Sequence, residues 1–91
     1  MVQLMNLTAE QIQIASLIDA RVRELADAGN DDMTVFAEMA DYMSGFKRLM
    51  DTSTRDELDA LCQRFAGFFQ YAQILERVAA GIQSGDIKVP H

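Results

Sequence analysis

Apolar residues recur along the chain at spacings of three and four, which is the period of an amphipathic α-helix. The longest such run starts after Thr54 and continues to residue 82. Its members follow the alternating spacing that seats one helix against another. They are Leu58, Leu61, Phe65, Phe68, Ala72, Leu75, Ala79 and Ile82. The run predicts one long helix over residues 55–83.

A second set of signals defines a helix near the start of the chain. Thr8 followed three residues later by Gln11 is the pattern of a capping box. Gly29 is placed to end the same helix in the left-handed conformation. Between these two signals the apolar spacing leaves Asp19 on the outer side. The pattern predicts a helix over residues 9–28.

The segment between these two helices is also helical in its apolar pattern. Methionine and phenylalanine recur at helical spacing and predict a helix over residues 32–51. Thr54 and Glu57 then form a second capping-box pattern, which marks the start of the long helix. Ser84 and Gly85 are expected to end that helix.

The predicted architecture is an all-α, three-helix, up-down-up bundle with a long C-terminal helix. Short turns separate the three helices, so neighbouring helices are expected to run antiparallel. We expect a single domain over residues 1–91. Residues 1–7 form a lead-in and residues 85–91 a tail, and both are expected to be flexible or strapped onto the body.

Apolar side chains from all three helices are expected to form the core. The central position of Phe65 in the long run predicts that its truncation is the most damaging single change. The predicted core residues are Ile18, Val22, Leu25, Phe36, Met39, Met43, Phe46, Leu58, Leu61, Phe65, Phe68 and Phe69.

The length of the last helix predicts a dimer. A helix of about 29 residues spans ~43 Å, against ~30 Å for helices of about 20 residues. The surplus end is apolar, and monomers avoid such exposed patches. We therefore expect a homodimer, and the alternative is a monomer whose helix ends near Ala80 with Gly81 as its stop. The predicted interface residues are Ala72, Leu75, Val78, Ala79 and Ile82.

Composition and charge narrow the expected environment and partners. The net charge of −6 disfavours contact with a nucleic-acid backbone, which needs a basic surface. Polar residues interrupt the most apolar stretch, so no membrane span is expected. The first residues lack the basic and apolar regions of a secretory signal. The single Cys62 cannot form an internal disulfide and favours a cytoplasmic location.

Few residues offer catalytic, cofactor or metal chemistry. The only histidine is His91, so a histidine-based triad inside the chain and a structural zinc site are not expected. Glu38 and Asp41 lie three apart on one helix face, and solvation is the favoured interpretation. Cys62 lies beside the apolar run without a neighbouring histidine, which favours an inert thiol. We therefore predict no catalytic, cofactor-binding or metal-binding residues, and no enzyme activity.

The leading functional hypothesis is a non-catalytic, homodimeric module that binds another protein. One alternative is an acidic regulator that neutralises a basic partner, as an antitoxin or a DNA mimic does. Another is a small-ligand binder or a small enzyme subunit with an apolar pocket between the helices.

Overall fold

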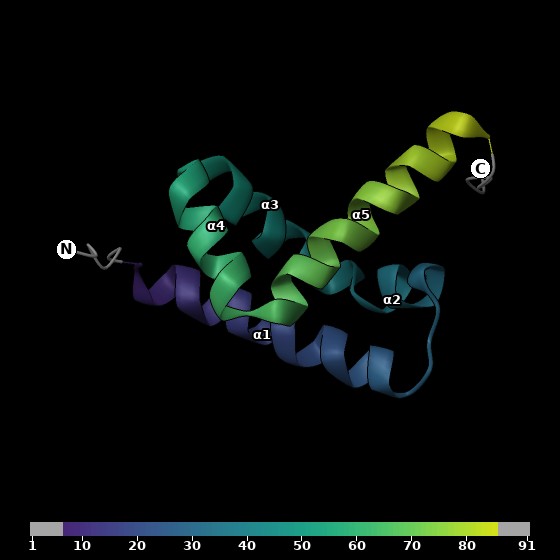
Figure 1. Ribbon diagram of the computed structural model, residues 1–91, viewed down its shortest axis with the longest axis horizontal. Coiled ribbons are helices and arrows are strands. Elements are labelled where there is room, and N and C mark those ends of the chain that lie inside the picture. The colour runs from purple at the N-terminus through teal and green to yellow at the C-terminus, as the bar shows by residue number, and fades with distance from the viewer. Residues whose placement is uncertain (1–6, 86–91) are drawn as a thin grey trace.

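The computed structural model describes residues 7–85, and every element in this part of the chain is a helix (Figure 1). The predicted all-α class is confirmed. The elements are α1 (Ala9–Asp27), α2 (Asp32–Glu38), the 3-10 helix η1 (Ala40–Tyr42), α3 (Met43–Thr52), α4 (Arg55–Arg64) and α5 (Ala66–Ser84). The predicted lead-in and tail lie outside the described residues, apart from residues 7 and 85.

Two helices begin at the capping boxes that the sequence predicts. The Thr8 N–H donates to Gln11 Oε1 at 2.8 Å, and the Gln11 N–H donates to Thr8 Oγ1 at 3.1 Å. Thr54 and Glu57 make the same reciprocal pair at 2.7 and 3.2 Å. Gly29, with φ of 86°, follows the end of α1 as predicted. These predictions are confirmed. They could be made from the sequence because each signal depends only on neighbouring residues.

The single helix predicted over residues 32–51 is wrong, because the chain bends at Met39. The φ and ψ of Met39 are −95° and 12°, and its carbonyl accepts the N–H of Tyr42 at 2.9 Å to form η1. The helices on either side differ in one partner, since α2 contacts both α5 and α1 while α3 contacts α1. The bend separates α2, which contacts α5, from α3, which contacts α1.

The single helix predicted over residues 55–83 is also wrong, because it is divided at one residue. Phe65 has the extended φ and ψ of −122° and 96°. Its N–H closes α4 by donating to the Leu61 carbonyl at 2.8 Å. Its carbonyl opens α5 by accepting the N–H of Phe68 at 3.1 Å. The N–H and the carbonyl of Phe65 thus both make helical hydrogen bonds. The helix is interrupted by the φ and ψ angles of this residue.

Helix α5 is the central element of the fold. It packs against α1, α2 and α4, and its last turns extend beyond the other helices in Figure 1. The buried apolar side chains come from every α-helix and form one core. They are Ala15, Ile18, Val22, Leu25, Val35, Met39, Phe46, Leu49, Leu61, Phe68, Tyr71, Ile74 and Val78.

The residues predicted for the core divide into three groups. Seven of them are buried, namely Ile18, Val22, Leu25, Met39, Phe46, Leu61 and Phe68. Phe36, Met43, Leu58 and Phe65 are half-buried. Phe69 is exposed at 47%, so its core assignment is wrong. The buried face of α5 is centred near Tyr71, and Phe69 lies about 160° away around the helix.

The cap of α2 predicts a loss of stability in acid. Hydrogen bonding to Thr34, whose N–H donates to Asp31 Oδ1 at 2.8 Å, lowers the pKa of Asp31. A lowered folded-state pKa stabilises the protein above the unfolded value, and this contribution is lost as the pH falls below about 4. Urea unfolding of Asp31→Ala should show a deficit against wild type at neutral pH that shrinks at about pH 3. An equal deficit at both pH values would contradict this role.

Candidate interaction surface

A carboxylate from α1 caps the start of α5. The Gly67 N–H donates to Asp19 Oδ1 at 2.7 Å, and the Arg23 guanidinium donates to Asp19 Oδ2 at 2.9 Å. Asp19 is only 8% exposed, so its predicted outer position is wrong. The N-cap residue of α5, Phe65, offers no side-chain acceptor, and Asp19 supplies one from another helix. The start of α5 is therefore fixed by α1.

The backbone of α5 also approaches α1 closely at this point. A Cβ atom on Gly67 would lie 2.5 Å from the Asp19 carbonyl oxygen and 2.8 Å from its Cα. Real Cβ atoms do not approach backbone so closely, so this crossing requires glycine. The close contact sets the direction in which α5 leaves the body.

An ion pair ties the second half of α5 to α2. Arg77 donates from Nε to Asp32 Oδ2 at 2.7 Å and from Nη2 to Asp32 Oδ1 at 3.2 Å. This hydrogen bonding raises the pKa of Arg77. The adjacent Val78 is 3% exposed in the single chain. Val78 therefore belongs to the core of the chain, and its assignment to an interface between chains is wrong.

The other four predicted interface residues form an apolar stripe along α5. Ala72 and Leu75 are half-buried and pack against the core, whereas Ala79 and Ile82 are exposed. The four lie within about 80° of one another around the helix axis. We call this set the α5 stripe. Exposure along it increases toward the C-terminal end, where Ile82 is 41% exposed.

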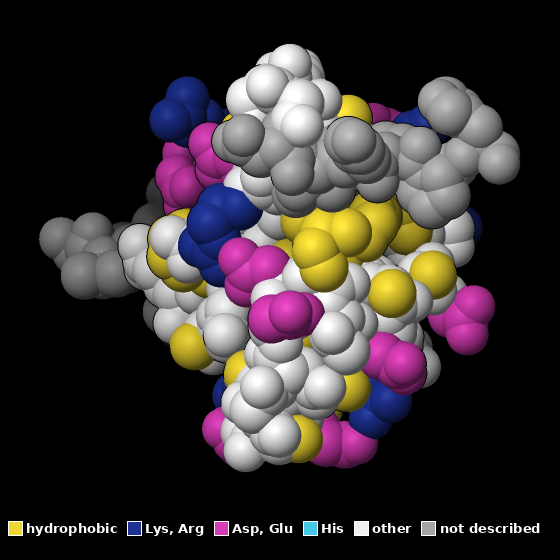
Figure 2. Space-filling view, turned by 90° about the vertical axis from the view of Figure 1, so that its right-hand side faces the viewer, with side chains coloured by type: hydrophobic (Ala, Val, Ile, Leu, Met, Phe, Trp, Pro, Cys, Tyr) yellow, Lys and Arg dark blue, Asp and Glu magenta, His cyan; other side chains and the backbone are white. Residues whose placement is uncertain are grey.

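The end of α5 carries no charge. No residue from Val78 to Gly85 is charged, in a chain with a net charge of −6. Figure 2 shows hydrophobic side chains at the surface between the end of α5 and α2. The exposed apolar residues of these two helices include Met33 and Ile82. The uncharged end of α5, with Ile82 at its surface, favours contact with another apolar surface.

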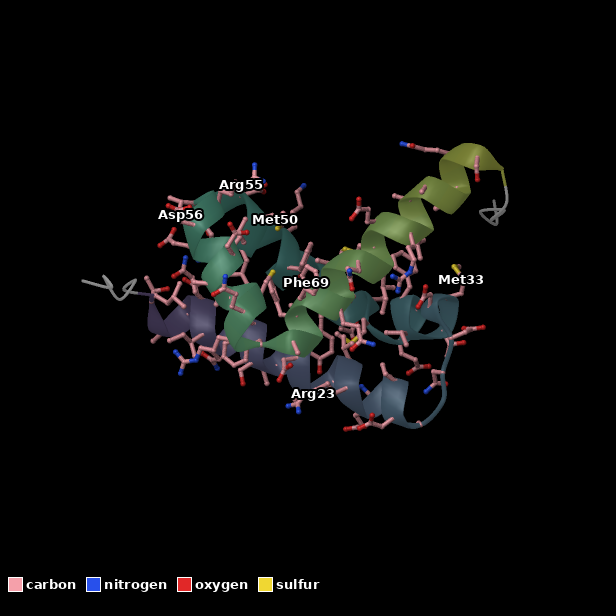
Figure 3. The ribbon with its side chains drawn as sticks, in the orientation of Figure 1. Arg23, Met33, Met50, Arg55, Asp56 and Phe69 are labelled. Carbon is pink, nitrogen blue, oxygen red and sulfur yellow. The ribbon has the colours of Figure 1, made fainter. Side chains whose placement is uncertain are left out.

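Other large apolar side chains are exposed elsewhere. Figure 3 places Met50 near the end of α3 and Phe69 near the start of α5, with Met33 on α2 at the other end of the molecule. Leu17 is exposed on α1. Of the three residues that Figure 3 labels here, Met33 is the one at the end of the molecule where the α5 stripe becomes exposed.

The structure describes the surroundings of Cys62 and Glu38, two residues that the sequence offered for chemistry. Burial and the nearby Asp59 raise the pKa of Cys62, which disfavours the thiolate. Glu38 lies 3.7 Å from the Arg21 guanidinium, while Asp31 caps α2. Within residues 7–85 no pocket is found, and no group of three or more acidic, histidine or cysteine side chains is placed to hold a metal ion.

No helix in the described part of the chain is long and apolar enough to cross a membrane. Comparison of the chain with models of known protein families, with curated proteins and with solved structures finds no match.

Proposed function

We propose that this protein is a non-catalytic interaction module that acts as a homodimer through the α5 stripe. The observation that carries the proposal is the exposed, charge-free end of α5, with Ala79 and Ile82 at its surface. Two chains of net charge −6 repel each other, and the repulsion is weakest where they meet through uncharged surfaces.

A two-fold axis near Ala79 makes the stripe complementary to itself. Two antiparallel copies of α5 then place Leu75 of one chain opposite Ile82 of the other, with the small Ala79 side chains at the crossing. Specific interfaces bury roughly 800 Å² per partner, which is more than four side chains supply. Met33, exposed at the same end of the molecule, extends the surface.

The acidic groups favour this proposal over an acidic regulator, because several of them already stabilise the fold. Asp19 caps α5, Asp31 caps α2 and Asp32 pairs with Arg77, so these carboxylates already act in the fold. We propose that the dimer presents its remaining exposed apolar residues to a further protein and that it acts in the cytoplasm.

Two neighbouring alanines allow a matched test of the dimer. Ala79 and Ala80 are both exposed on α5, but Ala80 lies about 80° beyond the edge of the stripe. Ala79→Glu is expected to raise the dimer dissociation constant at least about tenfold, because it places two carboxylates in an apolar contact. Ala80→Glu is expected to leave the constant unchanged. Sedimentation equilibrium over a range of protein concentrations measures both constants.

Circular dichroism of both variants provides the control, since the two changes have the same helix propensity and should retain the same helix content. A wild-type protein that stays monomeric at high micromolar concentration contradicts the proposal. Equal weakening of the dimer by the two substitutions also contradicts it, because the effect then comes from added charge and not from the stripe.

A further inference from the structure

Over residues 55–83 the continuous helix that the apolar pattern predicts is interrupted in the structure at a single residue. The pattern of alternating spacings runs through Phe65 without a gap, yet the structure divides the helix there. Residues 64–66 are arginine, phenylalanine and alanine, none of which prevents a helix. The sequence of this junction is therefore compatible with both a bent and a straight path.

Little has to change for α4 and α5 to become one helix. The Phe65 N–H and carbonyl already bond within α4 and α5. Its φ of −122° and ψ of 96° differ from helical values mainly in ψ. Once ψ becomes helical, residues 55–84 form a continuous helix of about 45 Å. The Gly67 N–H would then donate to the carbonyl of Gln63 in its own helix.

The contact that holds the bent path comes from α1. Asp19 accepts the Gly67 N–H at 2.7 Å, and this bond exists only while α5 starts at the break. Straightening removes α5 from α1 of its own chain and uncovers core residues such as Phe68 and Tyr71. The surface that fits this uncovered core is the same helix from a second copy.

We infer that Phe65 is a hinge at which α5 is exchanged between two copies of this chain. In the exchanged dimer α4 and α5 form one straight helix, and each α5 packs on the α1 of the other copy. Exchange of an identical element at a short hinge is a known route to dimers. This exchange does not depend on the α5 stripe, because its contacts are those of the core.

Two substitutions act on the hinge in opposite directions. Asp19→Ala removes the acceptor that caps α5 in the bent path, whereas the straight helix loses no cap because Gly67 has a backbone partner there. Ala66→Pro acts the other way. Ala66 is the first residue of α5, a position where proline is favoured, and Phe65 has the extended backbone preferred before proline. In a continuous helix the same proline removes a hydrogen bond and clashes with the preceding turn.

The test is carried out on the full chain carrying Ala79→Glu, which removes contact through the α5 stripe. Any dimer that remains then comes from exchange at Phe65, so failure of one proposal is distinguished from failure of the other. Each variant is unfolded in denaturant, refolded at high protein concentration and separated by size-exclusion chromatography with light scattering. Asp19→Ala should form several-fold more dimer than Asp19→Asn. These two variants both lose the ion pair to Arg23, but only asparagine retains the acceptor. Adding Ala66→Pro to Asp19→Ala should return the dimer fraction to the Asp19→Asn level.

A distance measurement identifies the geometry of the dimer. Spin labels on Asp56→Cys and Gln83→Cys, in a Cys62→Ser background, are placed on a chain diluted with unlabelled chains. We expect a distance of about 40 Å within each labelled chain of the dimer fraction, and a shorter distance in the monomer. Equal distances in the two fractions overturn the proposal, as do equal dimer fractions for Asp19→Ala and Asp19→Asn.

The Ala66→Pro variant decides the question even if Asp19→Ala does not fold. Without the Asp19 change, Ala66→Pro must remove the dimer fraction of its parent while the melting temperature is retained. A parent that refolds without any dimer overturns the inference. A dimer fraction that survives Ala66→Pro overturns it as well.

Discussion

Phe68→Ala is expected to be the most damaging truncation in this protein, with a loss of about 3–5 kcal/mol in the free energy of unfolding. Phe68 is 1% exposed, and its ring lies 5.5 Å from that of Phe46, centroid to centroid. Phe46 in turn contacts Tyr71 edge-on at 5.2 Å. Removing the Phe68 ring leaves a buried cavity beside Phe46. Small domains have only about 5–15 kcal/mol of stability, so the variant should be partly unfolded at 37 °C.

The neighbouring Phe69 provides the matched control. It has the same side chain on the same helix but is half exposed, so Phe69→Ala should change stability much less. Phe65, which the sequence pattern favours as the central position, is half-buried, and its truncation should fall between the two. Urea unfolding followed by circular dichroism ranks the three variants. A larger loss for Phe65→Ala than for Phe68→Ala would contradict the core described above.

Gly67→Ala is expected to destabilise the protein by about 1–3 kcal/mol, although alanine is the better helix former by roughly 1 kcal/mol. The added methyl group meets the backbone of Asp19 at 2.5 Å, and backbone cannot move aside as a flexible side chain does. Relief requires α5 to move away from α1, which weakens the hydrogen bond from the Gly67 N–H to Asp19. The midpoint of urea unfolding measures the effect.

Gly45→Ala is the control for that prediction. The nearest atom to a Cβ at Gly45 is Ile14 Cγ2 at 3.3 Å, the end of a side chain that can shift slightly. Gly45 lies inside α3, so alanine should gain helix propensity there and leave stability unchanged or raised. If both glycine substitutions stabilise the protein, α5 does not approach α1 as closely as described.

Much of the secondary structure was predictable because its signals are local. The capping boxes at Thr8 and Thr54 act over three residues, and Gly29 ends α1 by its own backbone preference. Apolar spacing identified the helical segments and the residues that turn toward the core in α1. These features need no information about which helix packs on which.

The candidate surface was predictable only in part. The apolar pattern located Ala79 and Ile82 on an exposed stripe, but it could not separate them from Val78, which is buried in the same turns. Whether an apolar residue on a helix faces its own chain or the outside depends on where the neighbouring helix lies. Here the neighbour is α2, which contacts α5 and ends at the bend at Met39.

The sequence by itself determined an all-helical chain, the start and end of its first helix and the capping box that begins α4. Only the tertiary structure decided that α4 and α5 are separate helices. None of residues 64–66 prevents a helix, so local propensity alone favours the straight path. Asp19 satisfies the start of α5 from a position 48 residues away in the chain, and the close approach at Gly67 fixes the crossing. No local pattern contains that contact, because it exists only when α1 and α5 have packed together.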